Sequence, residues 1–303
     1  MSEWLGIEIG GTKLQLVVGV PGTIRLRRRL TVTPERGGEG IRSQIRGALS
    51  ELLQAGSIRG VGVGFGGPVN WRTGKICRSH QIEGWSEFDL ASWLGELVHL
   101  PVTIDNDANV GALGEALHGA GTGANPVFYV TLGSGVGGGL VVDGRIYHGS
   151  TPGEMEIGHV RLDREGTIVE NRCSGWAVER RIRELRRGHP DSPLARLTAG
   201  LTSGEAKQLV PAIQQDDAVA KQLLQETSND LAFGLSHVTH LCHPEVIVLG
   251  GGLSCVGEPL RAAVQNALPR FLMEAFAPGP KIALARLGED AVPMGALQLA
   301  SAH

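Results

Sequence analysis

Three glycine-rich segments each follow directly on an apolar stretch of the chain. They are EIGGTK (Glu8–Lys13), TLGSGVGGG (Thr131–Gly139) and LGGGL (Leu249–Leu253). A glycine turn exposes backbone N–H groups, and the hydroxyls and the lysine beside these turns add further donors, so each segment suits phosphate oxygens. One such segment is equally typical of an ordinary hairpin turn. Three together indicate a nucleotide site, with two segments for phosphates and one for the adenosine end, although G-x-x-x-x-G-K-[ST] is absent.

Three consecutive polar residues, Asp105, Asn106 and Asp107, precede a predicted helix in IDNDANVGALGEA (Ile104–Ala116). One Asp or Asn in this position is commonly a helix cap, whose side-chain oxygen accepts a backbone N–H. Three exceed what a cap requires, and a carboxylate at the mouth of a cleft can accept the proton of a substrate hydroxyl as a general base. The segment is therefore a candidate for catalysis as well as for capping.

A further polar group lies in PGEMEIGHVRL (Pro152–Leu162), which contains Glu154, Glu156 and His159. On one loop these side chains can bond several hydroxyls of a single ligand, and a surface turn with scattered charge has the same pattern. The signature H-E-x-x-H is absent, which argues against a zinc-protease type of metal site.

The elements that must position these residues occur in two copies. Residues 4–20 are predicted to form strand, turn and strand, and residues 126–149 repeat that plan, each followed by alternating strands and helices. The pattern predicts two related α/β lobes, with the glycine turns facing a cleft between them. We expect one lobe over residues 1–118 and the other over 119–303, with a last helix over about 292–303 packing back on the first lobe.

Composition argues against several classes of protein. The chain has 303 residues, a net charge of −3 and a pI near 6.4, which disfavour nucleic-acid binding through phosphate contacts. Its four cysteines have neither metal-ligand nor redox spacing and indicate a reducing compartment. No signal peptide is visible, and the most apolar run is too short to span a bilayer, so we expect a cytoplasmic protein without a membrane partner.

Taken in order, the motifs resemble those of the ROK family (repressors, open reading frames and sugar kinases) of the actin-like ATPase superfamily, over essentially the whole chain. The matching stretches are IEIGGTK, GFGGPVN (Gly64–Asn70), IEGW (Ile82–Trp85), IDNDANVGALGEA, VTLGSGVGGGLVVDGRIYHG, EIGH, VIVLGGGL and VPMGALQLA. The resemblance implies an α/β fold of two actin-like (RNase H-like) lobes with a nucleotide- and sugar-binding cleft. It also implies a kinase that transfers the γ-phosphoryl group of Mg-ATP to a hexose, with the 6-hydroxyl of glucose or a similar hexose as acceptor.

The resemblance further implies a role for each motif residue. Asp107 is the expected base that deprotonates the sugar hydroxyl. Sugar contacts are expected from Gly66, Gly67, Asn106, Glu156, His159 and Glu170. Nucleotide contacts are expected from Glu8, Gly10, Gly11, Thr12, Lys13, Thr131, Gly133, Ser134, Gly135, Gly137, Gly251 and Gly252. Members often form dimers, so a homodimer is one expectation and the oligomeric state stays open.

Three departures from the family pattern stand out. Glu8 stands where the family usually has Asp, beside the phosphates and Mg²⁺, and Met155 stands where it has a glycine before the E-I-G-H motif. The cluster C-x-C-G-x-x-G-C, which many members carry as part of a zinc site, is missing, because Cys173 is the single cysteine within residues 159–179. A structural zinc normally needs four ligands, so we expect none. Alignment across this gap places Glu170 on the family's sugar-side glutamate.

Three alternatives stay open. Glu8 leaves room for a sugar-binding protein without turnover. A repressor of the family would carry a helix-turn-helix ahead of the first phosphate motif, and that motif begins here at residue 7, so a repressor of that type is not expected. An ATPase or activase on the same fold is disfavoured, since it would not need the sugar-side residues. A kinase for an N-acetylated amino sugar is not separated from a glucokinase by these motifs.

Overall fold

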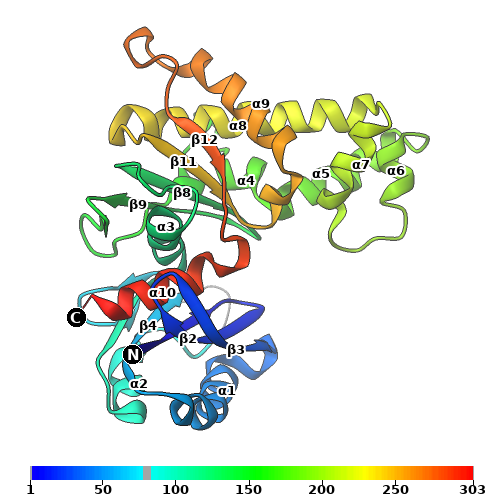
Figure 1. The fold of residues 1–303 in the computed structure, drawn as a ribbon. Helices are drawn as coiled ribbons and strands as arrows, with labels where there is room; N and C mark the ends of the chain where they lie inside the picture. The colour runs from blue at the N-terminus through cyan, green and yellow to red at the C-terminus, as the bar shows by residue number, and fades with distance from the viewer. Residues whose placement is uncertain (1, 78–82, 303) are drawn as a thin grey trace. The chain divides into compact units, whose positions relative to one another are not determined.

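The computed structural model describes residues 2–77 and 83–302 and divides the chain into two compact units (Figure 1). Unit 1 comprises Met1–Gly123, Gly139–Met155 and Arg286–His303, and unit 2 comprises Ala124–Gly138 and Glu156–Ala285. The strands are β1 (Glu3–Ile9), β2 (Lys13–Val20), β3 (Thr23–Thr31), β4 (Ile58–Phe65), β5 (Val69–Asn70), β6 (Lys75–Ile76), β7 (Val102–Asn106), β8 (Val127–Leu132), β9 (Val136–Val142), β10 (Arg145–Ile146), β11 (Val246–Gly250) and β12 (Lys281–Leu284). The α-helices are α1 (Gly37–Leu52), α2 (Leu90–Val98), α3 (Asp107–His118), α4 (Val169–Cys173), α5 (Gly175–Gly188), α6 (Pro193–Leu197), α7 (Leu209–Gln214), α8 (Ala218–Cys242), α9 (Glu258–Ala267) and α10 (Ala291–Ser301).

The sheet of unit 1 has the strand order β3-β2-β1-β4-β7. β1, β2 and β3 form an antiparallel meander, whereas β1, β4 and β7 run parallel. In the parallel part, Ile9 pairs with Phe65 and Phe65 pairs with Asn106, so the three strands end level with one another. The loops that leave these strand ends are therefore neighbours, and loops at the carboxyl ends of parallel strands are where α/β proteins usually bind ligands.

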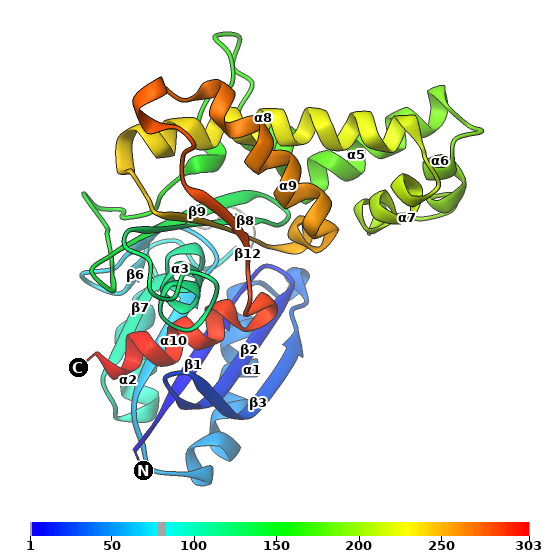
Figure 2. The same cartoon turned by 45° about the horizontal axis from the view of Figure 1, so that its top comes forward.

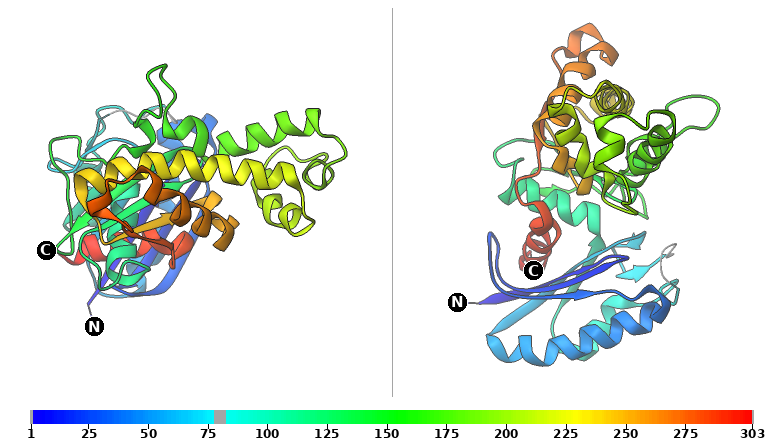
Figure 3. Two further views of the ribbon diagram at one scale, coloured as in Figure 1. Left: turned by 90° about the horizontal axis from the view of Figure 1, so that it is seen from above. Right: turned by 90° about the vertical axis from the view of Figure 1, so that its right-hand side faces the viewer.

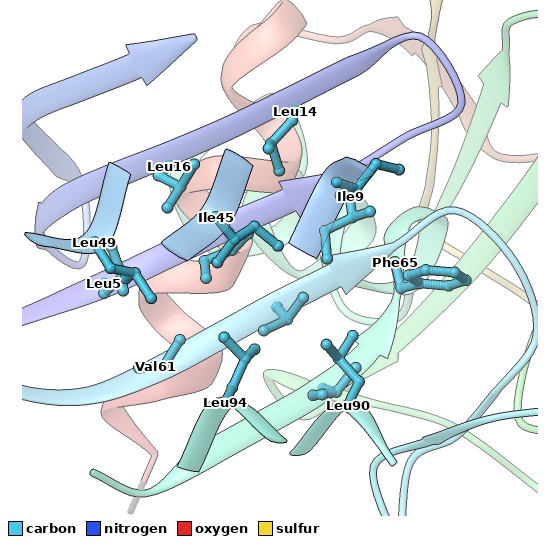
Figure 4. Close-up of a cluster of buried hydrophobic side chains, with 14 of the residues drawn as sticks. Leu5, Ile9, Leu14, Leu16, Ile45, Leu49, Val61, Phe65, Leu90 and Leu94 are labelled. Carbon is cyan, nitrogen blue, oxygen red and sulfur yellow. The ribbon is translucent and has the colours of Figure 1, made fainter. Parts of the chain in front are cut away.

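The core of unit 1 lies between this sheet and α1 and α2. β1 alternates buried Leu5, Ile7 and Ile9 with residues that face the opposite side, the period-two pattern of a strand. Figure 4 shows Leu5 and Ile9 with Ile45 and Leu49, which α1 contributes at helical spacing. The right-hand view in Figure 3 shows α1 (blue) and α10 (red) on opposite faces of the sheet.

The last helix, α10, belongs to unit 1 and packs against α3, β1 and β4. Glu115 of α3, whose side chain is fully buried, binds the chain segment that leads into α10. One carboxylate oxygen of Glu115 accepts the Leu287 N–H at 2.7 Å, and the other accepts the N–H groups of Arg286 at 3.1 Å and of Ala120 at 2.7 Å. A buried carboxylate is thus fully hydrogen-bonded, and α3 is anchored at its carboxyl-terminal end.

The second sheet has the order β10-β9-β8-β11-β12, in which β8, β11 and β12 run parallel. In unit 2, α9 packs on β12 and on the long helix α8, as Figure 2 also shows. Gly250 at the end of β11 pairs with Thr131 of β8, so the second and third glycine-rich segments leave adjacent strand ends. Within residues 2–77 and 83–302, no helix combines the length and the apolar character needed to cross a bilayer.

Candidate active site

The first glycine segment forms the tight turn between β1 and β2 in unit 1. The Gly10 N–H donates to the Lys13 carbonyl oxygen at 2.9 Å, and the Thr12 side chain is exposed at the turn, next to Gly11. Lys13 Nζ lies 3.1 Å from one oxygen of Glu8, and Gln15 Nε2 donates to the other at 2.7 Å. Burial raises the pKa of Glu8, outweighing the opposite effects of Lys13 and Gln15. Lys13, which we expect to face phosphate, is therefore paired with Glu8, the residue that stands where the family it resembles usually has Asp.

The Gly66–Gly67 loop, which is expected to contact the sugar, lies beside this turn. The Gly66 N–H donates to the Ile9 carbonyl oxygen at 2.8 Å, at the end of β1. A Cβ on Gly66 would lie 3.3 Å from the Ile9 carbonyl oxygen, 3.4 Å from Asp107 Oδ2 and 3.6 Å from the Gly10 Cα, so Gly66 borders both the Asp107 carboxylate and the first turn. Asn106 Nδ2 donates to the Gly67 carbonyl oxygen at 3.1 Å. The structure thus brings together Gly66, Gly67, Asn106, Asp107 and the first turn. Of the predicted stretch IEGW, Ile82 lies outside the described residues.

Capping and chemistry are divided between neighbouring residues at the start of α3. Asn106 is the cap, since its Oδ1 accepts the N–H groups of Ala108 at 2.8 Å and of Asn109 at 3.3 Å. Asp107 is the first helical residue and is half-buried. The partial positive charge of a helix N-terminus stabilises a negative charge at this position. Asp107 therefore need not cap the helix and can serve as a base.

Asp105 lies directly behind these two residues and is 3% exposed. Its Oδ1 accepts the Asn106 N–H at 2.8 Å, and its Oδ2 lies 2.5 Å from His148 Nε2. The His148 ring stacks on Trp71, with ring centroids 4.0 Å apart. The sequence motifs contain Asp105 and His148 but do not relate the two residues, and they do not include Trp71, because no local pattern links residues 43 positions apart.

In unit 2, the second glycine segment forms the turn between β8 and β9. The Gly133 N–H donates to the Gly135 carbonyl oxygen at 2.9 Å, and the Gly175 N–H donates to the Gly133 carbonyl oxygen at 2.7 Å. Glu170 Oε2 accepts the Val136 N–H at 2.9 Å, and a Cβ on Gly135 would lie 2.5 Å from that oxygen. Glu170, expected as a sugar ligand, thus has one oxygen on the backbone next to the second glycine turn.

The other predicted residues of unit 2 lie near the same strand ends. Ser134 is exposed at the turn, Thr131 is half-buried in β8, and Gly137 is the second residue of β9. A Cβ on Gly251, which has φ +77°, would lie 2.5 Å from the Leu132 backbone nitrogen. A Cβ on Gly252 would meet no heavy atom within 4 Å in the described part of the chain. Packing thus accounts for Gly251, whereas Gly252 borders open space.

The E-I-G-H motif contains a short 3₁₀ turn, η3 (Ile157–His159), flanked by exposed Glu156 and ending at exposed His159. A Cβ on Gly158 would lie 2.2 Å from the Val136 carbonyl oxygen, so this motif packs directly on the start of β9. Glu154, two residues earlier, belongs to unit 1, where its Oε1 accepts the Val69 N–H at 2.7 Å beyond the Gly66–Gly67 loop. Glu154 thus belongs to unit 1 and Glu156 to unit 2, although only Met155 separates them in the sequence.

The segment in which the family resemblance places the missing cysteine cluster is a compact turn. Arg161 and Ile168 form an antiparallel bridge, and Asp163 Oδ1 accepts the N–H groups of Gly166 at 2.8 Å and Thr167 at 2.9 Å. Cys173 is fully buried, and burial raises the pKa of its thiol strongly. Over residues 2–77 and 83–302, no group of three or more His, Cys, Asp and Glu side chains is arranged to hold a metal ion. The expected lack of zinc stays a prediction.

Known proteins resemble the chain over nearly its whole length. The model of the ROK family matches residues 4–303. A glucokinase of Halalkalibacterium halodurans is 32% identical, over 96% of this chain and 93% of that protein. A ROK family glucokinase from Streptomyces griseus, solved in complex with glucose and AMPPNP, is 29% identical with a TM-score of 0.85, covering 98% of this chain and 99% of that one. A ROK hexokinase from Thermus thermophilus is 26% identical with a TM-score of 0.81, covering 98% and 97%.

These likenesses confirm the actin-like α/β fold and the family predicted from the sequence motifs. The chain therefore belongs to the ROK family, and it is a sugar phosphotransferase.

Proposed function

We propose that the protein transfers the γ-phosphoryl group of Mg-ATP to the 6-hydroxyl of glucose or a similar hexose. The observation that carries the proposal is the position of Asp107, at the N-terminus of α3 and against the Gly66–Gly67 loop, where parallel strands end. The choice of glucose is supported by the glucokinases to which the chain is similar.

Asp107 acts in this proposal as the general base that accepts the proton of the attacking hydroxyl. Phosphoryl transfer needs little covalent work from the protein, so orienting the nucleophile and stabilising charge supply most of the catalysis. The contribution of a general base is typically about 10²–10⁴-fold. Asn106 caps the same end of the helix. Its side-chain amide donates one hydrogen to the Gly67 carbonyl oxygen, and its second amide hydrogen can bond a sugar hydroxyl.

The nucleotide is assigned to the glycine turns. The turn at Gly10–Thr12 and the turn at Gly133–Gly135 both have short backbone connections and an exposed hydroxyl residue, which fits the oxygens of a polyphosphate. Mg²⁺ prefers oxygen ligands, and Glu8 is the carboxylate beside the first turn. The bound ion would neutralise negative charge on the phosphates. Gly251 and Gly252 are assigned to the adenosine because of the family resemblance, and Gly251 lies beside Leu132 at the end of β8.

The test is ADP release with Mg-ATP over a panel of hexoses and N-acetylhexosamines, with Asp107→Asn measured in parallel. Sugar-dependent release that falls by about 10²–10⁴-fold in the variant, while circular dichroism and Tm are retained, supports the kinase and identifies its sugar. A wild-type rate that no sugar increases, or a variant as active as the wild type, contradicts it. A preference for N-acetylated sugars would favour the amino-sugar kinase, in which Met155 reshapes the sugar contacts.

A second candidate is a sugar-binding protein without turnover. It is favoured by Glu8, because both of its oxygens are engaged by Lys13 and Gln15 and burial raises its pKa. Calorimetric binding of a sugar without ADP release would support this candidate. Turnover gained in Glu8→Asp would then identify the extra methylene as the reason.

A further inference from the structure

We propose that His148 is a positioning residue for the reaction: through Asp105 it holds the start of α3, and with it Asn106 and Asp107. The kinetic consequence rests on the proposed kinase function, whereas the structural consequence does not. All the residues involved belong to unit 1.

The first step is the contact between the two side chains. His148 Nε2 lies 2.5 Å from Asp105 Oδ2, and the side chains are 16% and 5% exposed. Any form of the imidazole that carries a hydrogen on Nε2 makes this bond. A carboxylate oxygen at this depth requires a donor, because burying an unpaired charge is strongly unfavourable.

The second step connects Asp105 to the functional residues. Its Oδ1 accepts the Asn106 backbone N–H at 2.8 Å and Asn109 Nδ2 at 2.9 Å. The Asn109 amide also donates to the Gly153 carbonyl oxygen at 2.8 Å, which ties the first turn of α3 to the chain segment that follows His148. One carboxylate therefore holds the peptide that enters α3 and a side chain of its first turn.

The third step is the orientation of the imidazole. Trp71 stacks on the His148 ring at an interplanar angle of 14°, and Arg72 Cζ lies 4.3 Å from the centroid of the Trp71 ring. The stack fixes the plane of the ring and so the direction of Nε2.

Loss of the Nε2 donor leaves Asp105 Oδ2 without this partner, so the carboxylate turns toward other donors and releases the start of α3. A displaced base lowers the rate of the chemical step, because a misplacement of about 1 Å can cost roughly 10²-fold. We expect kcat to fall by about 10–100-fold and KM for ATP to change little, since the pair holds α3 and not the glycine turns.

The experiment compares four variants of the full chain. His148→Leu removes the donor because leucine has no side-chain N–H, and His148→Asn removes it because the asparagine amide is too short to reach Asp105. His148→Gln is longer and keeps an N–H near the position of the imidazole Nε2. His118→Leu is the matched control: its Nε2 bonds Gln298 Oε1 at 3.0 Å at the opposite end of α3. The readouts are hydrogen exchange of a peptide spanning residues 102–112, kcat, and KM for ATP and sugar.

The proposal expects faster exchange and lower kcat in His148→Leu and His148→Asn, near wild-type values in His148→Gln, and neither effect in His118→Leu. Unchanged exchange in both donor-free variants would overturn it, as would equal effects in the control. If His148→Leu does not fold, His148→Asn decides. If the wild type shows no turnover, the proposed function fails, and the exchange data alone still support or refute the role of His148.

Discussion

Glu170 provides the sharpest test of how the site is built. The resemblance assigns it to the sugar, yet its Oε2 accepts the Val136 N–H at 2.9 Å and lies against Gly135 in the turn between β8 and β9. We predict that Glu170→Ala raises KM for ATP rather than KM for the sugar, because removing the carboxylate loosens the turn that is assigned to the phosphates.

The expected size follows from the contact. A hydrogen bond to a charged group contributes about 1.5–3 kcal/mol. Glu170 is half-buried, and two further backbone bonds hold Gly133 in the turn, so the lower value applies. A loss of ~1.5 kcal/mol corresponds to roughly tenfold in an equilibrium constant, and hence to about tenfold in KM for ATP. Glu170→Gln keeps an oxygen acceptor without the charge, so its KM for ATP should rise no more than about threefold.

The assay is initial-rate kinetics with ATP and sugar varied in turn. The matched control is Glu179→Ala, because Glu179 also accepts one backbone N–H in unit 2, that of Gly204 at 2.8 Å, but from a different loop. Glu179→Ala should lower the free energy of unfolding by about as much as Glu170→Ala, and its KM for ATP should stay at the wild-type value.

The opposite kinetic pattern would refute the reasoning. If both Glu170 variants raised KM for the sugar and left KM for ATP unchanged, the contact with Val136 would be incidental, and the sugar role that the family resemblance implies would stand. An equal rise of KM for ATP in Glu179→Ala would show that general destabilisation, and not the turn, is responsible.

Three further outcomes are expected. A Cβ on Gly158 would lie 2.2 Å from the Val136 carbonyl oxygen, so Gly158→Ala should lower the free energy of unfolding by about 1–3 kcal/mol in urea titrations, and an unchanged midpoint would contradict this packing. Burial raises the pKa of Glu8 above its ordinary 4.5, so its contribution to stability is present below that pH and is lost as the pH rises through the folded pKa. Glu8→Gln should flatten this part of the stability profile, whereas parallel profiles would count against a buried carboxyl. Burial also raises the pKa of the Cys173 thiol, so a thiol reagent should label exposed Cys255 and spare Cys173 until the chain unfolds, which peptide mapping checks.

Local patterns predicted the strands and turns that carry the motifs. The alternation of Leu5, Ile7 and Ile9 with Gly6 and Glu8 is set by the pleat of a single strand and can be recognised in the sequence. The apolar spacing of α1 is equally local. The polar triplet at residues 105–107 indicated both a cap and a base, but only the structure shows that Asn106 caps α3, since capping depends on where the helix begins.

The sequence by itself determined the order of the motifs, and with it the family, because each motif is a short stretch whose residues act within one turn. The tertiary structure alone decided which distant groups meet. Asp105 and His148 are 43 residues apart, and Glu170 and Val136 are 34 apart. Such pairs depend on strand register and helix packing, which bring together parts of the chain that no local spacing relates.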